Sequence, residues 1–432
     1  MSYKLFKILL SIFCSIIAFD VACQSNLTLN DAIVIGLSQS DNVKVSTLNS
    51  EIAQKQVYKA NAGMLPRIDW NVNVGSSYNN VNQEFVDGRI INRFGRTIAP
   101  NTNLTLSWTL FDGGKMRSRY DLLQAQSDLE KRNTEIVKEE LINTIADQYY
   151  SIARQKESII FLKKNISFYE DRYRITKERW ELGKGTKPDV LQSQNDLNIQ
   201  KNSIEIAESS LRDLKAALNL TLNRDANIDF DVVELISEKK QYDSNNMLNQ
   251  IMQKDDMIKF FDQQIAINQI NETDLKGNTK PRINFSSALG YSLNNTNAGL
   301  ILLNQNLGLN AAVNATWNLY DAGHNRKQIE INRLRTNVIE QQKAAYINGI
   351  KSKLHIALNR YELGNKLVEM SQENKSIAEE NLSINIEKFK LGASTILEVN
   401  DAQQRFDNAA NSFINAKFDL KLIELEIEKL LR

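Results

Sequence analysis

The chain has 432 residues, enough for two or three domains of ordinary size. Its 53 lysine and arginine residues balance 52 aspartate and glutamate residues, so no net field draws it to nucleic acid or to an acidic surface. Four prolines and 17 glycines are few for this length and favour long uninterrupted helices. No stretch of 18 apolar residues follows the N-terminus, so no transmembrane helix is predicted in the mature chain.

Residues 1–23 have the pattern of a secretory signal peptide. Lys4 and Lys7 precede an apolar run over 8–19, and small residues follow it. The alternative is a buried N-terminal helix.

Cys14 and Cys23 are the only cysteines. Cleavage after Cys23 leaves a mature chain that cannot form a disulfide. Cleavage before Cys23 would leave this residue for lipidation, although Asp20 stands where an apolar residue is wanted. Both outcomes remain open.

Two helices of similar length are predicted, each ending shortly before a proline. The first runs from Leu29 to about Asn61, with Asn30 as its N-cap, and ends ahead of Pro66. The matching helix, 245–277, ends ahead of Pro281, which follows Pro66 by 215 residues.

Period-two alternation of apolar and polar residues predicts four strands of about ten residues each. The alternation is clearest over 68–74, 104–110, 283–289 and 313–319, and polar loops over 76–101 and 293–305 join each strand pair. Such strands can cross a bilayer at a tilt, and the tryptophans and tyrosines near their ends suit an aromatic girdle. A half-buried sheet in a soluble protein would show the same alternation.

Long helices follow each strand pair. One is predicted from Gly114 to about Leu182, some 69 residues or roughly 100 Å, and a shorter one covers 186–222. Apolar residues recur every seven positions, which predicts coiled-coil packing. These heptad positions are Ile145, Ile152, Ile159, Ile166, Tyr173, Trp180, then Val190, Leu197, Ile204, Leu211, Leu218, and in the second half Val399, Phe406, Phe413, Leu420, Ile427.

The strand-to-helix junction occurs twice. Phe111-Asp112-Gly113-Gly114 ends the first returning strand, and Tyr320-Asp321-Ala322-Gly323 ends the second, 209 residues later. The same offset relates Gly183 to Gly392, so the chain contains an internal duplication. It predicts a first structural repeat over 24–222, a polar equatorial connector over 223–244 and a second repeat over 245–432.

No catalytic or metal site is predicted. His324 and His355 are the only histidines, and a helical surface or core role suits them. Residues 183–186 superficially resemble a phosphate loop but lack its spacing and its preceding strand. We expect no enzyme activity and no cofactor.

Taken together, the signal peptide, the duplication, the Pro66 and Pro281 strand entries and the two junctions resemble the TolC family of outer-membrane efflux proteins. The resemblance covers nearly the whole mature chain. It implies a mostly α fold with a transmembrane β part. Three copies would form one 12-stranded β-barrel and an α-helical periplasmic tunnel. Trimerisation also follows from physics, because four strands are too few to close a barrel and open edges are not tolerated in lipid.

The resemblance places a periplasmic aperture at the two helix turns. Matching positions assign Asp189 and Gln192 to one turn and Glu398 and Asp401 to the other. Glu398 and Asp401 share a helix face, so three copies would form carboxylate rings. The family's basic latch residue is replaced by Ser394, and Lys184 or Lys187 is the candidate substitute. Alternatively, Glu398 and Asp401 form an ordinary solvent-exposed acidic face of a helix, without a role in an aperture.

Partners also follow from the resemblance. Leu182 with Gly183, and Leu391 with Gly392, would dock a periplasmic membrane-fusion adaptor, and an inner-membrane pump of RND or ABC type would deliver the cargo of efflux or type I secretion. The homotrimer and outer-membrane lipid are the other partners, and nucleic acid is not. A periplasmic coiled-coil adaptor or a soluble helical scaffold are the alternative functions.

Overall fold

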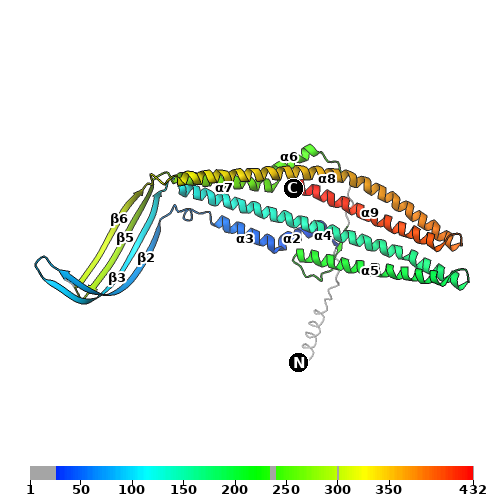
Figure 1. Cartoon of the computed structure of the whole chain (residues 1–432), viewed down its shortest axis with the longest axis horizontal. Helices are drawn as coiled ribbons and strands as arrows, with labels where there is room; N and C mark the ends of the chain where they lie inside the picture. The colour runs from blue at the N-terminus through cyan, green and yellow to red at the C-terminus, as the bar shows by residue number, and fades with distance from the viewer. Residues whose placement is uncertain (1–25, 234–239, 299–300, 432) are drawn as a thin grey trace, which may run out of the picture. The chain divides into compact units, whose positions relative to one another are not determined.

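The computed structural model describes residues 26–233, 240–298 and 301–431 (Figure 1), so the predicted signal peptide, with Cys14 and Cys23, lies outside the described residues. In chain order the elements are β1 (Asn26–Leu27), α2 (Leu29–Gln39), α3 (Asp41–Lys55), β2 (Arg67–Glu84), β3 (Ile90–Phe111), α4 (Lys115–Glu181), α5 (Lys187–Thr221), β4 (Asp231–Val232), α6 (Ser244–Lys254), α7 (Asp256–Gly277), β5 (Arg282–Thr296), β6 (Leu303–Thr316), α8 (His324–Lys390) and α9 (Ile396–Leu431).

Two compact units divide the chain. We call Met1–Val45, Glu135–Asp255 and Ile347–Arg432 the hairpin unit, and Ser46–Thr134 with Asp256–Tyr346 the sheet unit. No helix in the described part of the chain is long and apolar enough to cross a membrane.

The sheet unit contains one four-stranded antiparallel sheet in the order β2-β3-β5-β6 (Figure 1). Pairing of β3 with β5 joins the two halves of the duplication. Cross-strand partners share a face. One row on the apolar face is Trp70, Leu104, Leu289 and Leu309, and the next row, on the polar face, is Asn71, Asn103, Gly290 and Gly308.

The strands are longer than the alternation predicted. They have 18, 22, 15 and 14 residues, and the expected loop over 76–101 is mostly strand. A tight turn replaces it, in which the Phe85 amide donates to the Arg89 carbonyl at 2.9 Å and Gly88 adopts φ +83°. Backbone pairing, which is independent of side-chain type, extends the hairpin through its asparagine-rich part.

Tryptophans close both helix-side ends of the sheet. The Trp108 indole donates to the Met64 carbonyl at 3.1 Å, and the Trp317 indole donates to the Thr279 carbonyl at 3.0 Å. The expected strand over 313–319 nevertheless stops at Thr316, so Trp317 lies in irregular backbone.

The helix predicted from Leu29 to Asn61 is wrong in three respects. It is divided at Ser40, it ends at Lys55, and its N-cap is Thr28 rather than Asn30. The Thr28 hydroxyl accepts from the Asp31 amide at 3.1 Å, and the Asp31 carboxylate accepts from the Thr28 amide at 3.4 Å, which forms a capping box. The matching helix, predicted over 245–277, is divided at Asp255, 215 residues after Ser40.

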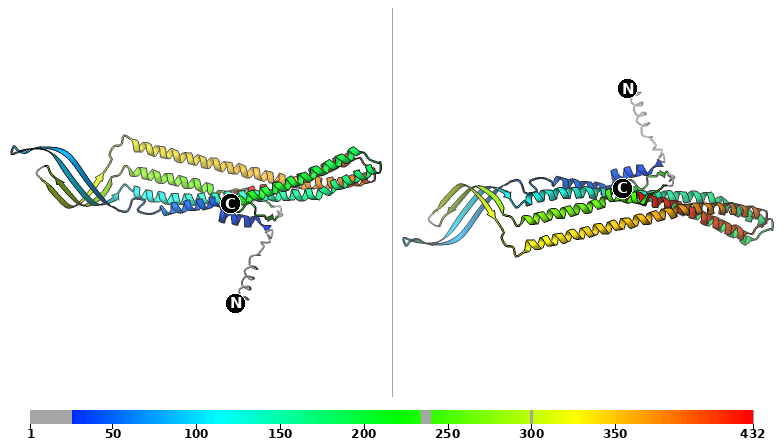
Figure 2. Two further views of the ribbon diagram at one scale, coloured as in Figure 1. Left: turned by 90° about the horizontal axis from the view of Figure 1, so that it is seen from below. Right: turned by 90° about the horizontal axis from the view of Figure 1, so that it is seen from above.

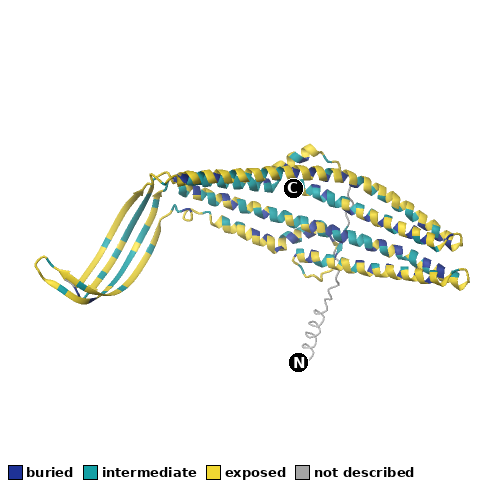
Figure 3. Ribbon diagram, in the orientation of Figure 1, coloured by how far each residue is buried: buried dark blue, intermediate teal, exposed yellow. Residues whose placement is uncertain are grey.

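The long helices are confirmed. α4 and α8 have 67 residues each, and α5 and α9 have 35 and 36. Buried positions form stripes along them (Figure 3) and include Ile145, Ile152, Leu197 and Val399.

The predicted heptad register drifts in two places. In α4 the buried residues beyond Ile159 are Phe161, Asn165, Arg172, Ile175 and Thr176, whereas Ile166 and Tyr173 are only half-buried. In α9 Ile414 and Phe418 are buried in place of Phe413 and Leu420. A straight helix with 3.6 residues per turn departs from a strict seven-residue repeat by about 20° per heptad, so the facing side chain changes.

Candidate functional site at the two helix turns

Both helical hairpins turn through a glycine in the left-handed region. Gly183 has φ +68° and Gly392 has φ +77°, a conformation that disfavours any side chain. In each turn the next amide closes the helix end: Lys184 donates to the Arg179 carbonyl and Ala393 to the Lys388 carbonyl, both at 2.8 Å.

The predicted aperture carboxylates Asp189 and Glu398 lie in the first turns of α5 and α9 and accept hydrogen bonds from residues just before these helices. Asp189 accepts from the Thr186 hydroxyl at 2.7 Å, and Glu398 accepts from the Thr395 amide at 2.8 Å. The Ser394 hydroxyl also donates to Glu398, at 2.7 Å, and this bond is the main reason that the pKa of Glu398 is lowered. Ser394 therefore supports its own turn in this protomer.

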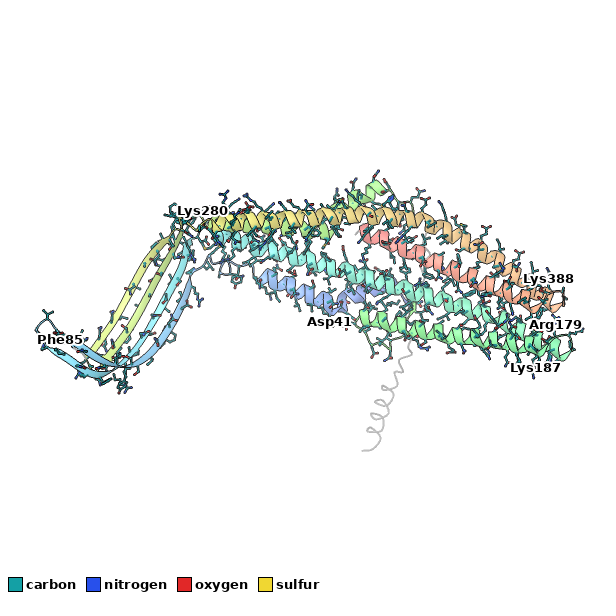
Figure 4. All side chains as sticks on the ribbon, viewed as in Figure 1. Asp41, Phe85, Arg179, Lys187, Lys280 and Lys388 are labelled. Atoms are coloured by element: carbon teal, nitrogen blue, oxygen red, sulfur yellow. The ribbon has the colours of Figure 1, made fainter. Side chains whose placement is uncertain are left out.

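The two turns share one groove of about 530 Å³ in the hairpin unit, and Figures 1 and 2 show both turns at the same end of that unit. Asp189 and Glu398 both line it. Arg179 links its walls, because the guanidinium donates to the Phe389 carbonyl at 3.2 Å and lies over the Phe389 ring at 4.7 Å from its centre. Figure 4 labels Arg179 near the C-terminal end of α4.

The remaining predicted aperture residues lie elsewhere on these helices. Asp401 forms an ion pair with Arg405 at 2.7 Å and shares with Glu398 a second groove, of about 470 Å³, between α8 and α9. Gln192 is exposed on α5 and lines neither groove.

The candidate latch lysines and docking leucines are exposed. Within 26–233, 240–298 and 301–431, Lys184 and Lys187 form no ion pair. The side chains of Leu182 and Leu391 are 71% and 84% exposed.

A buried polar cluster that the sequence reasoning missed joins α4 to α5 and α9. Arg172 is only 3% exposed and donates to Asn400 at 2.6 Å, to Gln403 at 3.2 Å and to Asp196 at 2.6 Å. Burial lowers the pKa of Arg172, and the ion pair with Asp196 opposes that shift.

One turn away in α4, Tyr169 donates to the Asp407 carboxylate at 2.7 Å, and Asn165 also donates to Asp407. We call Asn165, Tyr169, Arg172, Asp196, Asn400, Gln403 and Asp407 the polar seam. Several of its buried atoms have no partner in the described part of the chain, among them Asn165 Oδ1, Arg172 Nε and Gln403 Nε2. The sequence did contain a signal for this cluster, because a polar residue stands one position before each predicted heptad position in α4.

The residues of the two predicted junctions lie in the sheet unit, directly before α4 and α8, although β6 ends at Thr316 and not at Tyr320. Asp321 accepts from the Gly323 amide at 3.0 Å and from the Asn325 amide at 2.8 Å, which caps α8. Gly114 and Gly323 have φ +95° and +78°. Asp112 differs from Asp321, because its Oδ1 atom is buried without a partner among the residues that the structure describes.

Nothing in the described ranges groups three or more histidine, cysteine, aspartate or glutamate side chains as a metal site would. Of the two histidines, His355 is exposed and lies 3.2 Å from the Asn359 amide.

The fold is similar to solved outer membrane channels. The CmeC channel of Campylobacter jejuni superposes with a TM-score of 0.77 at 17% identity, over 93% of this chain and 85% of that one. VceC of Vibrio cholerae gives 0.73 at 16%, over 93% and 95%. The open state of MtrE from Neisseria gonorrhoeae gives 0.70 at 17%, over 93% and 88%. A comparison with curated protein sequences gives no match.

The sequence profile of the family described as "Outer membrane efflux protein" matches residues 33–224 and 278–431. This is more than half of the chain, and it confirms the resemblance drawn from the duplicated motifs. The chain therefore belongs to the outer membrane efflux protein family.

Proposed function

We propose that this protein is the outer-membrane channel-tunnel of a tripartite efflux or type I secretion system, a passive exit duct that catalyses no reaction. The observation that carries the proposal is the sheet. It has an exposed apolar face and two unpaired edge strands, and each strand pair leads into a 67-residue helix.

The apolar face suits lipid. Trp70, Val74 and Leu309 are 73%, 71% and 71% exposed, and a continuous apolar surface of this kind marks a membrane or protein contact. The edges β2 and β6 leave backbone groups unpaired, which lipid does not tolerate. Three copies pairing β6 to β2 would close a barrel of 12 strands in the outer membrane.

The internal duplication fits a two-repeat protomer. We assign 24–222 to the first repeat, 223–244 to the equatorial connector and 245–432 to the second repeat. The two halves have the same order of elements, β2-β3-α4-α5 and β5-β6-α8-α9, which supports this assignment.

The helix turns are the proposed gate and docking surface. Asp189, Gln192, Glu398 and Asp401 would line the aperture in three copies. In Asp189 and Glu398 the capping bonds fall on a single carboxylate oxygen, so the other oxygen remains for a neighbouring protomer. Exposed Leu182 and Leu391, each beside its turn glycine, would receive the hairpin of a periplasmic adaptor that connects to the inner-membrane pump.

Membrane fractionation tests the duct. We expect the mature protein in the outer membrane as an oligomer that runs as a trimer on gels until it is heated, and we expect the purified trimer to form channels in planar bilayers. A monomer that is freely soluble in the periplasm would instead favour an adaptor or a scaffold.

The gate has its own test. In the tip-neutral variant, Glu398→Gln with Asp401→Asn, glutamine keeps the capping geometry while both charges are lost. Because the charged groups would hold the closed tip by hydrogen bonds, resting conductance should rise by about twofold or more. An unchanged conductance would remove both residues from the gate.

A further inference from the structure

Charged residues are missing from most of the sheet. None occurs in 70–83, 97–111 or 283–316, although 24% of the whole chain is charged. These ranges cover most of β2, β3, β5 and β6. Arg67 and Asp69, at the start of β2, pair with each other at 2.8 Å.

Lipid explains only half of this pattern. A charge on the apolar face would be costly in hydrocarbon, but a face turned to a water-filled lumen normally accepts charged side chains. Between its ends the polar face of this sheet carries none: Arg67, Asp69 and Arg282 lie at its helix-side end, and Arg93 lies near its opposite end. Its amide and hydroxyl residues include Asn71, Asn73, Asn101, Asn103, Thr105, Ser107, Thr109, Asn284, Ser286, Ser292, Asn306, Asn310 and Asn314.

Polar side chains of neighbouring strands form hydrogen bonds with one another on this face. Asn71 donates to Asn103 Oδ1 at 3.1 Å, and Thr109 donates to Asn284 Oδ1 at 3.1 Å. Gly290 and Gly308 lie in the same row as Asn103, and because they have no side chains, nothing projects from the sheet at these two positions. An amide offers both a donor and an acceptor, so this surface hydrates cations and anions alike.

We infer that the polar face is a charge-indifferent wall: in the assembled duct, the sheet segment lets cationic, anionic and neutral solutes pass without sorting them by charge, and any charge preference arises in the helical part. The inference rests on the proposed function. Ion selectivity of the assembled duct should respond strongly to a single substitution, because one charged side chain per protomer would become a ring of three.

The test is the reversal potential of single trimers in a KCl gradient across a planar bilayer. We expect the tip-neutral variant with Asp189→Asn added, which lacks all three proposed aperture carboxylates, to have a K⁺ to Cl⁻ permeability ratio within about a factor of two of unity. Adding Asn103→Asp to that variant should shift the ratio toward K⁺ by about threefold or more, because the new carboxylate stands on the wall.

Asn92→Asp is the matched control. It makes the same chemical change in the same strand, but Asn92 lies on the opposite face from Asn103, so the ratio should stay near unity.

Two results would overturn the inference. One is a channel that lacks all three aperture carboxylates and still strongly prefers one ion, because that preference would then not arise at the helix turns. The other is an equal shift in the Asn92 and Asn103 variants, because the polar face would then not line the lumen. A protein that forms no channels at all contradicts the proposed function itself.

Discussion

At the scale of single residues, Ala322 occupies a backbone conformation that suits glycine better. Its φ is +54°, whereas the matching position of the first junction is Gly113, at φ +79°. A left-handed conformation costs a non-glycine residue about 1 kcal/mol. At Gly113 the space is also restricted, because a Cβ atom there would collide with the Gly277 carbonyl oxygen.

The two junctions should therefore respond oppositely to exchange of these residues. We expect Ala322→Gly to stabilise the sheet unit by up to about 1 kcal/mol and Gly113→Ala to destabilise it by about 2 kcal/mol or more. Thermal unfolding of the detergent-solubilised protein, followed by circular dichroism, measures both. Loss of stability in both variants would show that the Ala322 side chain makes a contact worth more than its strain.

Caps illustrate what residue patterns can predict. Gly183 and Gly392 were placed at the helix ends from their shared offset, and both have the positive φ that a C-terminal cap requires. The start of α2 was misplaced, because Asn30 and Thr28 are both good caps by type. The deciding feature is the reciprocal bond between Thr28 and Asp31, which needs the correct spacing as well as the correct residue types.

At the scale of elements, the polar seam sets how firmly α4 holds α9. Asp407 is buried against Tyr169 and Asn165, with the charged Arg172 next along α4. Burial is the main cause that raises the pKa of Asp407 above its ordinary value. The folded state then binds a proton more tightly than the unfolded state, so stability falls as the pH rises through the raised pKa and is level above it.

Asp407→Asn should remove this dependence on pH. Asparagine keeps an acceptor for the Tyr169 hydroxyl, and its amide can donate to Asn165 Oδ1, which has no partner in the described chain. We expect the variant to be more stable than the natural protein at pH 8, by about 1 kcal/mol. The difference should shrink as the pH is lowered toward the ordinary carboxyl pKa near 3.8, in the same unfolding measurement.

Asp401→Asn serves as the control for that measurement. Asp401 is exposed and paired with Arg405, so its replacement should change stability by less than about 1 kcal/mol over this pH range. If Asp407→Asn destabilised the protein equally at all pH values, the prediction would be wrong. The hydrogen bonds of the carboxylate would then outweigh the free-energy cost of burying its charge.

The strands illustrate why element boundaries were harder to predict than element types. Alternation identified all four strands, but it fades where asparagine, glycine and arginine occupy both faces, as in 79–96. The backbone pairs of Asn79 with Gly95 and of Asn82 with Asn92 continue the ladder there without any apolar face. Side-chain patterns report burial, and these positions are strands that bury little.

At the scale of the whole molecule, the edges of one chain point to other copies. A four-stranded sheet with a free edge at β2 and another at β6 is incomplete in lipid, and no rearrangement within one protomer pairs both. The sequence reasoning reached the same requirement from strand number alone. The order in which the strands pair, with β3 beside β5, came only from the structure.

The sequence by itself determined the local features: two copies of a strand pair leading into a 67-residue helix, and the glycines at which those helices turn. These follow from periodicity and backbone sterics, which act over a few residues. Tertiary structure alone decided that Asp189 and Glu398 face one groove, and that α4 buries Arg172 where the heptads predicted Tyr173. Such choices depend on which helices become neighbours, because a small drift in helix phase changes the buried side chain and no local pattern encodes the partner.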